Sequence, residues 1–246
     1  MSAERPEPGI PEIPEKLPRW HRRPQVITVE GELAAGKDTL CATLCEAYGF
    51  RYLDVSGIGR GLAAATLREG VDLENETAVG RFYAEADVDF AMEGSEASVC
   101  VNGADVTADL KTPETYDTSA RLIRYPFAPL RVGEIARDFI RPGNVVVNGR
   151  RLTNDIWPGA ELQLFLIGDF EVRLERRFRE LYKANPATTR KAVADAMRRR
   201  EAEEAAAGTG TASTSSLIID TTALAPDGVA STVVESHNRK IRFTTK

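Results

Sequence analysis

The chain has 246 residues, which is enough for one large domain or two small ones around a sizeable core. Apolar residues make up 42% and charged residues 28%, and the net charge is −5, which excludes a protein built to neutralise nucleic acid wholesale. Three cysteines and two histidines disfavour a disulfide framework, zinc chemistry and serine–histidine hydrolysis.

The sequence contains no apolar run of the roughly 18 residues that a bilayer span needs, and its beginning lacks the apolar core of a signal peptide. We therefore expect a cytoplasmic protein, a monomer or weak dimer, without a membrane or nucleic-acid partner. The first 24 residues contain six of the 13 prolines, with charged residues between them, and cannot bury enough apolar surface to order themselves. Residues 1–23 are expected to be a disordered arm, and residues 24–246 one domain.

Strand and helix patterns alternate along that domain. Residues 25–30 are β-branched and end at a glycine, which predicts a strand, and a helix is expected over 37–48. Asn102-Gly103 predicts a hairpin within residues 93–107. Further strands are expected over 50–54, 144–148, 162–167 and 217–220. Further helices are expected in the stretch with Leu62, Ala63 and Leu67, around 113–124 and 129–140, over 170–184 and 188–206, and from about 227. The alternation predicts an α/β fold with a parallel, doubly wound sheet. The small, polar stretch 205–216 is expected to be a mobile loop.

The sharpest motif lies between the first predicted strand and the first predicted helix. It reads Gly31-Glu32-Leu33-Ala34-Ala35-Gly36-Lys37-Asp38-Thr39, a phosphate-loop pattern in the strand–loop–helix context that such loops require. Its backbone N–H groups and the start of the helix favour an anion, and Lys37 is expected to reach the β- and γ-phosphates of a nucleotide. The residue after the lysine is Asp38 instead of Ser or Thr, so Thr39 is the candidate hydroxyl for Mg²⁺. Cys41 and Cys45, one turn apart, are interpreted as core residues.

Several weaker motifs follow in order. They are Leu53-Asp54-Val55-Ser56-Gly57-Ile58-Gly59-Arg60, Val106-Thr107-Ala108-Asp109-Leu110-Lys111-Thr112-Pro113-Glu114, Gly149-Arg150-Arg151 and Asp220-Thr221-Thr222-Ala223-Leu224. Together with the phosphate loop they resemble the cytidylate kinase family of nucleoside monophosphate kinases, from about Val26 onward. The resemblance implies a P-loop kinase core, an acceptor-binding insertion at about 82–112 and a lid at about 185–216. It also implies transfer of the γ-phosphoryl group of ATP, with Mg²⁺, to a small phosphorylated acceptor.

The family holds the acceptor phosphate with arginines from three segments, and Arg60, Arg150 and Arg200 stand at those positions. An arginine fork suits this task because it bonds two phosphate oxygens at once. Asp54 is expected either to hold a Mg²⁺-bound water or to cap a helix. Arg173 and Arg177 are expected to clamp ATP phosphates; a solvated basic face paired with glutamates one turn away is the alternative.

The residues that would recognise cytosine are altered. Val55, Ala120 and Ala207 stand where the family has polar or charged ligands, Ser119 lies beside one of them, and Arg151 replaces an aspartate. Arg131 is the one base ligand that is retained. Because lost hydrogen bonds to a base edge are costly, ordinary CMP is not the expected acceptor. The molecule expected to receive the phosphoryl group carries an anionic group, or a group rich in hydrogen-bond acceptors, near Arg151.

Two other interpretations remain open. The chain could be a divergent CMP or dCMP kinase whose base contacts are rebuilt from Arg131, Arg151 and Ser119. It could instead be a catalytically weak nucleotide-binding protein with a regulatory role. The phosphate-binding residues Lys37, Thr39, Arg60 and Arg150 favour an enzyme, since an inert scaffold has no physical need for them on separate segments.

Overall fold

The computed structural model describes residues 25–93, 96–225 and 228–233, so the arm expected over residues 1–23 lies outside the described residues. Its centre is a parallel sheet of strand order β2-β6-β1-β7-β8, as the alternating pattern predicts. The strands are β1 (Val26–Gly31), β2 (Arg51–Asp54), β6 (Val145–Asn148), β7 (Leu162–Ile167) and β8 (Leu217–Asp220). The carboxyl ends of β1, β2 and β6 are neighbours, so the loops that follow them open at one edge of the sheet.

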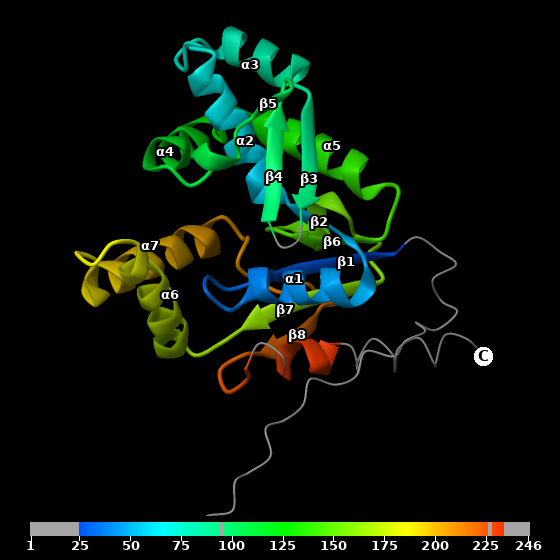
Figure 1. Cartoon of the computed structure of the whole chain (residues 1–246), viewed down its shortest axis with the longest axis vertical. Helices are drawn as coiled ribbons and strands as arrows, with labels where there is room; N and C mark the ends of the chain where they lie inside the picture. The colour runs from blue at the N-terminus through cyan, green and yellow to red at the C-terminus, as the bar shows by residue number, and fades with distance from the viewer. Residues whose placement is uncertain (1–24, 94–95, 226–227, 234–246) are drawn as a thin grey trace, which may run out of the picture.

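Helices cover both faces of this sheet (Figure 1). Because side chains alternate along a strand, Val26 of β1 packs into one core cluster, whereas Ile27 and Val29 pack into another. The first cluster includes α2 (Val55–Arg68) and α5 (Phe127–Ile140), and the second includes α1 (Lys37–Tyr48) and the helical residues 228–233. The sheet is therefore doubly wound.

A second, antiparallel sheet packs on α2. It consists of β3 (Val88–Glu93), β4 (Glu96–Val101) and β5 (Ala104–Asp105). The predicted turn joins β4 to β5, with φ of 52° at Asn102 and 75° at Gly103, both in the left-handed region that a tight hairpin needs. Gly61 of α2 lets the sheet approach, because a Cβ there would lie 2.8 Å from Val99. The sequence did not predict β3 or α3 (Glu76–Glu85); α4 (Pro113–Leu122) was expected.

Two further helices, α6 (Phe170–Ala184) and α7 (Arg190–Ala206), form a separate apolar cluster. Its buried members include Leu174 and Met197, and Leu33 and Ala34 of the phosphate loop pack against it. In Figure 1 this pair of helices lies to the left of the central sheet, below α4. The α6–α7 pair therefore rests on the phosphate loop. Within the described ranges, no helix combines the length and apolarity that crossing a membrane requires.

We predict that Gly31→Ala prevents stable folding. Gly31 has φ of 140°, and an added Cβ would lie 2.2 Å from the carbonyl oxygen of Leu166, a backbone atom that cannot move aside. Gly49→Ala is the matched control, because Gly49 also has a positive φ (65°) but no atom within 4 Å of the added Cβ. It should cost only about 1–2 kcal/mol. Urea unfolding of both variants measures the difference, and equal losses would contradict the steric argument.

Candidate active site

The phosphate loop joins β1 to α1 with three residues in the left-handed region. These are Gly31 (φ 140°), Ala34 (φ 60°) and Gly36 (φ 93°). Gly36 is the N-cap of α1 and provides no side-chain cap, so the first N–H groups of this helix have no side-chain acceptor. A helix start without such a cap, behind a loop of this shape, is suited to bind a phosphate.

Lys37 lies at the centre of the loop. Its Nζ donates to the carbonyl oxygens of Gly31 (3.0 Å) and Glu32 (2.7 Å). Burial and, to a smaller extent, the nearby Arg150 guanidinium lower the pKa of Lys37 to about 8, against the opposing effect of Asp38 and Glu204. The ammonium is therefore a poorly hydrated cation that an anion in the loop would stabilise.

Two of the three predicted phosphate arginines share one carboxylate near this lysine. Arg150, just after β6, donates to the Gly31 carbonyl (2.7 Å) and pairs with Glu204 of α7 at 2.8 Å. Arg200, one turn earlier in α7, donates to the same Glu204 oxygen at 2.9 Å. Burial lowers the pKa of Arg150, although Glu204 opposes this shift. Glu204 was not among the residues expected at the site; its spacing of four residues from Arg200 was the available signal.

The third predicted arginine, Arg60 of α2, lies with a different partner. Its guanidinium pairs with Asp54 at 2.7 Å and lies over the ring of Tyr116, 5.7 Å from the ring centroid. Its Nε is buried without a hydrogen-bond partner. Asp54 also caps α2 by accepting from the N–H of Ser56 (3.0 Å), which is the helix-cap role that the sequence left open. No bond between described residues joins Arg60 to Arg150 or Arg200.

Asp38 and Asp54 flank Asn148 at the carboxyl edge of the sheet. Asp54 and Asn148 are register partners on β2 and β6, and the Asn148 amide donates to Asp38 at 2.6 Å. Thr39 follows on the exposed first turn of α1. Among the described residues there is no group of three or more histidine, cysteine or acidic side chains that could hold a metal. Such an edge fits a Mg²⁺ ion that arrives with nucleotide phosphates, because Mg²⁺ commonly takes one or two carboxylates together with substrate oxygens.

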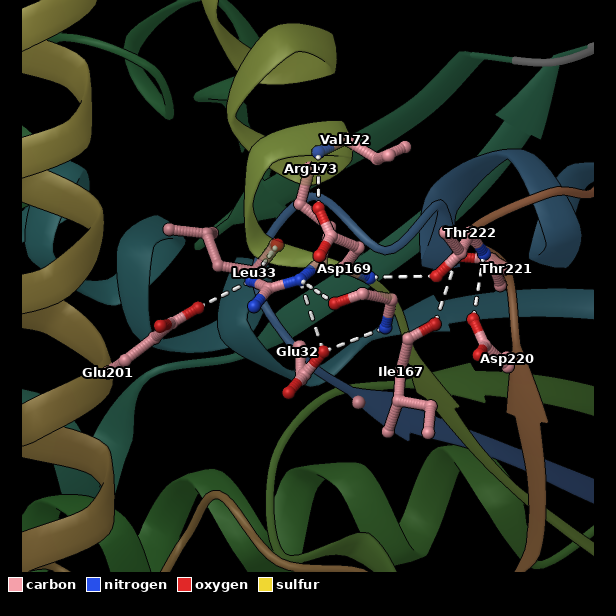
Figure 2. Close-up of polar contacts among 12 residues, drawn as sticks. Glu32, Leu33, Ile167, Asp169, Val172, Arg173, Glu201, Asp220, Thr221 and Thr222 are labelled. Atoms are coloured by element: carbon pink, nitrogen blue, oxygen red, sulfur yellow. Dashed lines mark hydrogen bonds and ion pairs between the residues drawn. The ribbon is translucent and has the colours of Figure 1, made fainter.

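Arg173 does not have the role expected from the sequence. Only 4% of its side chain is exposed, and its Nε donates to the Gly168 carbonyl (2.8 Å) and pairs with Glu32 (3.1 Å). Its Nη1 donates to the Leu33 carbonyl (3.0 Å) and to Glu201 of α7. Figure 2 shows these contacts converging on one guanidinium. Arg173 therefore tethers the phosphate loop to α7 and has little freedom to clamp ATP.

Arg176 and Arg177 follow on α6. Arg176 donates to the carbonyl oxygen (2.7 Å) and hydroxyl (3.1 Å) of Thr221, just after β8. Arg177 pairs with Glu180, as the alternative of a solvated basic face expects. Its contact with ATP phosphates remains a prediction.

The two arginines expected to read the acceptor's organic part are not joined to the others. Arg131 donates to the carbonyl oxygens of Tyr83 (3.0 Å) and Ala86 (3.1 Å), so it ties α5 to the end of α3. Arg151, with φ of 55°, is exposed and pairs with Asp155. That pairing raises the pKa of Arg151. The expectation that Arg151 faces a buried acceptor group therefore finds no support in these contacts.

Comparisons with known proteins point to one family. A model of the cytidylate kinase family matches residues 27–239. The cytidylate kinase of Mannheimia succiniciproducens is 35% identical over 156 residues, which are 63% of this chain and 69% of that protein. The cytidylate kinase of Chloroflexus aggregans is 33% identical over 195 residues, 75% of this chain and 82% of that protein. A solved structure of an uncharacterized protein from Eubacterium ventriosum has a TM-score of 0.51 at 11% identity, covering 88% of this chain and 99% of that one. This last likeness shows the fold alone.

We predict that ATP binding weakens as the pH rises through about 8. The pKa of Lys37 in the free protein is about 8, and phosphates bind the ammonium form, so the affinity should fall about tenfold per pH unit above that value. Lys37→Met should bind ATP weakly, without this dependence, and should lose phosphoryl transfer. Calorimetric titration of both proteins with ATP from pH 7 to 9.5 measures how the ATP affinity depends on pH. An affinity that stays level to pH 9.5 in the natural chain would contradict the assignment of Lys37.

Proposed function

The chain belongs to the cytidylate kinase family, and from this premise we propose that it phosphorylates a small molecule that bears a phosphate or phosphonate group and is not ordinary CMP. Membership makes it an ATP-dependent kinase of the nucleoside monophosphate kinase type. The identity of the acceptor is the part that we propose.

One contrast carries the proposal. The cations suited to phosphate are gathered, since Arg150 and Arg200 share one carboxylate beside Lys37. The cations that would recognise a base are engaged elsewhere, since Arg131 bonds two backbone carbonyls and Arg151 pairs with Asp155. Phosphate recognition without base recognition favours an acceptor that resembles CMP only in its phosphate group, or in a phosphonate that takes the place of this group.

Val55 and Ala120 agree with this contrast. Val55 is only 7% exposed and packs in the core, and Ala120 provides no polar atom from its exposed position on α4. Neither can hydrogen-bond the edge of a cytosine. A buried base edge loses about 1–3 kcal/mol for each contact that is not made.

The roles of this chain's residues follow from charge. The phosphate loop and the start of α1 orient the donor phosphates, and Lys37 balances the charge of the β- and γ-phosphoryl groups. Arg60, Arg150 and Arg200 hold the acceptor's phosphate so that its oxygen faces the γ-phosphorus. Mg²⁺, when bound with ATP, neutralises phosphate charge, and Thr39 and Asp54 are the residues that would hold it or its water. The packing of α6 and α7 on the loop excludes water from the transfer.

Two segments are proposed to complete the kinase. Residues 82–112 form the acceptor-binding insertion; in its support, β4 packs on α2, the helix that bears Arg60. Residues 185–216 form the lid; in its support, α7 packs on the phosphate loop, and its Glu204, which pairs with Arg200, acts electrostatically on Lys37.

A divergent CMP or dCMP kinase is the second candidate, and one observation favours it. A Cβ added at Gly59 would lie 3.8 Å from the Ser119 hydroxyl, so this hydroxyl lies close to the helix turn that carries Arg60. Ser119 is thus the residue best positioned to contact a base. The third interpretation, a weakly catalytic regulatory protein, is disfavoured by membership in a kinase family.

We predict that CMP and dCMP are poor acceptors, by at least about two decades in kcat/KM relative to the best acceptor. Two lost contacts of about 1.4 kcal/mol each account for two decades. A coupled assay of ADP release tests a panel of nucleoside monophosphates, sugar phosphates and phosphonates. Turnover of CMP at about 1–100 per second, as ordinary kinases achieve, would identify the chain as a plain cytidylate kinase with substituted ligands.

We also predict that Arg60→Ala and Arg150→Ala raise the KM of the acceptor far more than that of ATP. Each removes a charge-assisted contact of about 1.5–3 kcal/mol, which is roughly 10- to 150-fold. Arg141→Ala is the control, because Arg141 is an exposed arginine that pairs only with Asp138 in the described contacts. Steady-state kinetics with each substrate varied in turn separates the two effects. A selective rise in the KM of ATP would assign these arginines to the donor.

A further inference from the structure

Glu204 is a buried carboxylate for which the phosphoryl transfer described above has no use. It lies in the last turn of α7, and only 8% of the residue is exposed. One of its oxygens, Oε1, accepts from Arg150 at 2.8 Å and from Arg200 at 2.9 Å. An acidic side chain thus occupies the space between two arginines that are proposed to hold an anion from outside.

A small cavity also adjoins this carboxylate. It has a volume of about 140 Å³ and is lined by Arg150 and Glu204 together with Glu32, Glu201, Ala205, Gly210 and Thr211. Because this lining carries three carboxylates and one guanidinium, an anion has to take the place of Glu204 between the arginines rather than occupy the cavity. Gly208, which follows α7, has φ of 66°, and the N–H of Thr209 donates to the Glu204 carbonyl, so the chain turns sharply directly after the carboxylate.

We propose that Glu204 is a specificity-determining residue, an internal anion that occupies the acceptor-phosphate position and that an acceptor must displace. The inference rests on the proposed function, because it takes Arg150 and Arg200 as the acceptor's ligands. A carboxylate carries one charge, whereas a terminal phosphate carries about −1.5 to −2 at neutral pH and has three acceptor oxygens. A terminal phosphate or phosphonate can therefore bond both guanidinium groups more strongly than Glu204 does, whereas a carboxylate gains nothing by the exchange.

The exchange also couples the acceptor to the position of α7. While Glu204 bonds Arg150, α7 is joined to the end of β6 without any ligand. Once a phosphate replaces the carboxylate, it bridges Arg150 and Arg200 itself. The same pair of arginines then selects a doubly charged group on the acceptor and holds α7 closed over the site.

The test compares phosphate binding by Glu204→Gln and by the natural full-length chain. The probe is inorganic phosphate at pH 8, followed by calorimetry, with the donor site filled by a non-hydrolysable ATP analogue. Without an internal competitor, Glu204→Gln should bind phosphate at least about tenfold more tightly. Glu203→Gln is the matched control, because Glu203 is its exposed neighbour and loses the same charge. Its affinity should stay within about twofold of the natural chain.

The outcomes separate this inference from the proposed function. One outcome is that Glu204→Gln binds phosphate no more tightly than the natural chain does, while Arg150→Ala abolishes phosphate binding. This outcome would overturn the role of Glu204 and leave the acceptor site intact. A phosphate affinity that Arg150→Ala does not change would overturn the acceptor site and this inference together. If the glutamine variant does not fold, as a thermal melt would show, Glu204→Ala replaces it under the same expectations.

Discussion

The buried guanidinium of Arg173 is the interaction on which the arrangement of the site depends. It bonds the carbonyl oxygens of Leu33 and Gly168 and pairs with Glu32 and Glu201 (Figure 2). Transfer of a cation into a protein interior costs several kcal/mol unless opposite charge and hydrogen-bond acceptors surround it. The phosphate loop, the end of β7 and α7 supply these partners jointly. Each of the three is therefore held where the guanidinium requires it.

The same constraint governs the other cations of the site. Arg60 is paired with Asp54, and Arg150 and Arg200 share Glu204. In a half-buried site these carboxylates keep like charges from repelling one another before any phosphate arrives. A site built to receive two phosphorylated substrates thus carries its own anions. If these residues hold the substrates as proposed, binding is an exchange of partners rather than the filling of an empty space.

The proposed change of acceptor agrees with where the phosphate-binding residues and the base-reading residues lie in the fold. The phosphate loop and Arg150 follow strands in the middle of the sheet, and Arg60 and Arg200 join them from α2 and α7. Although Val55 packs in the core, most positions that would read the rest of the acceptor lie on α4, on α5 and in the turn after Arg150, nearer the surface. Substitutions there cost little stability, so a family can change its acceptor while it keeps its chemistry.

The sequence by itself determined much of the local structure, including the loop that is proposed to bind the donor. The phosphate loop and α1 were predicted to the residue, and β7 and α6 were too, because hydrophobic period, glycine and caps act over a few neighbouring residues. The partners of Arg131 and Arg173 were decided only by tertiary structure. Arg173 meets Glu32 and Glu201 across 141 and 28 positions of the chain, and no local pattern encodes such a meeting. Burial then turned a presumed ligand of ATP into a tether, since a guanidinium deep in a protein must bond whatever packing brings to it.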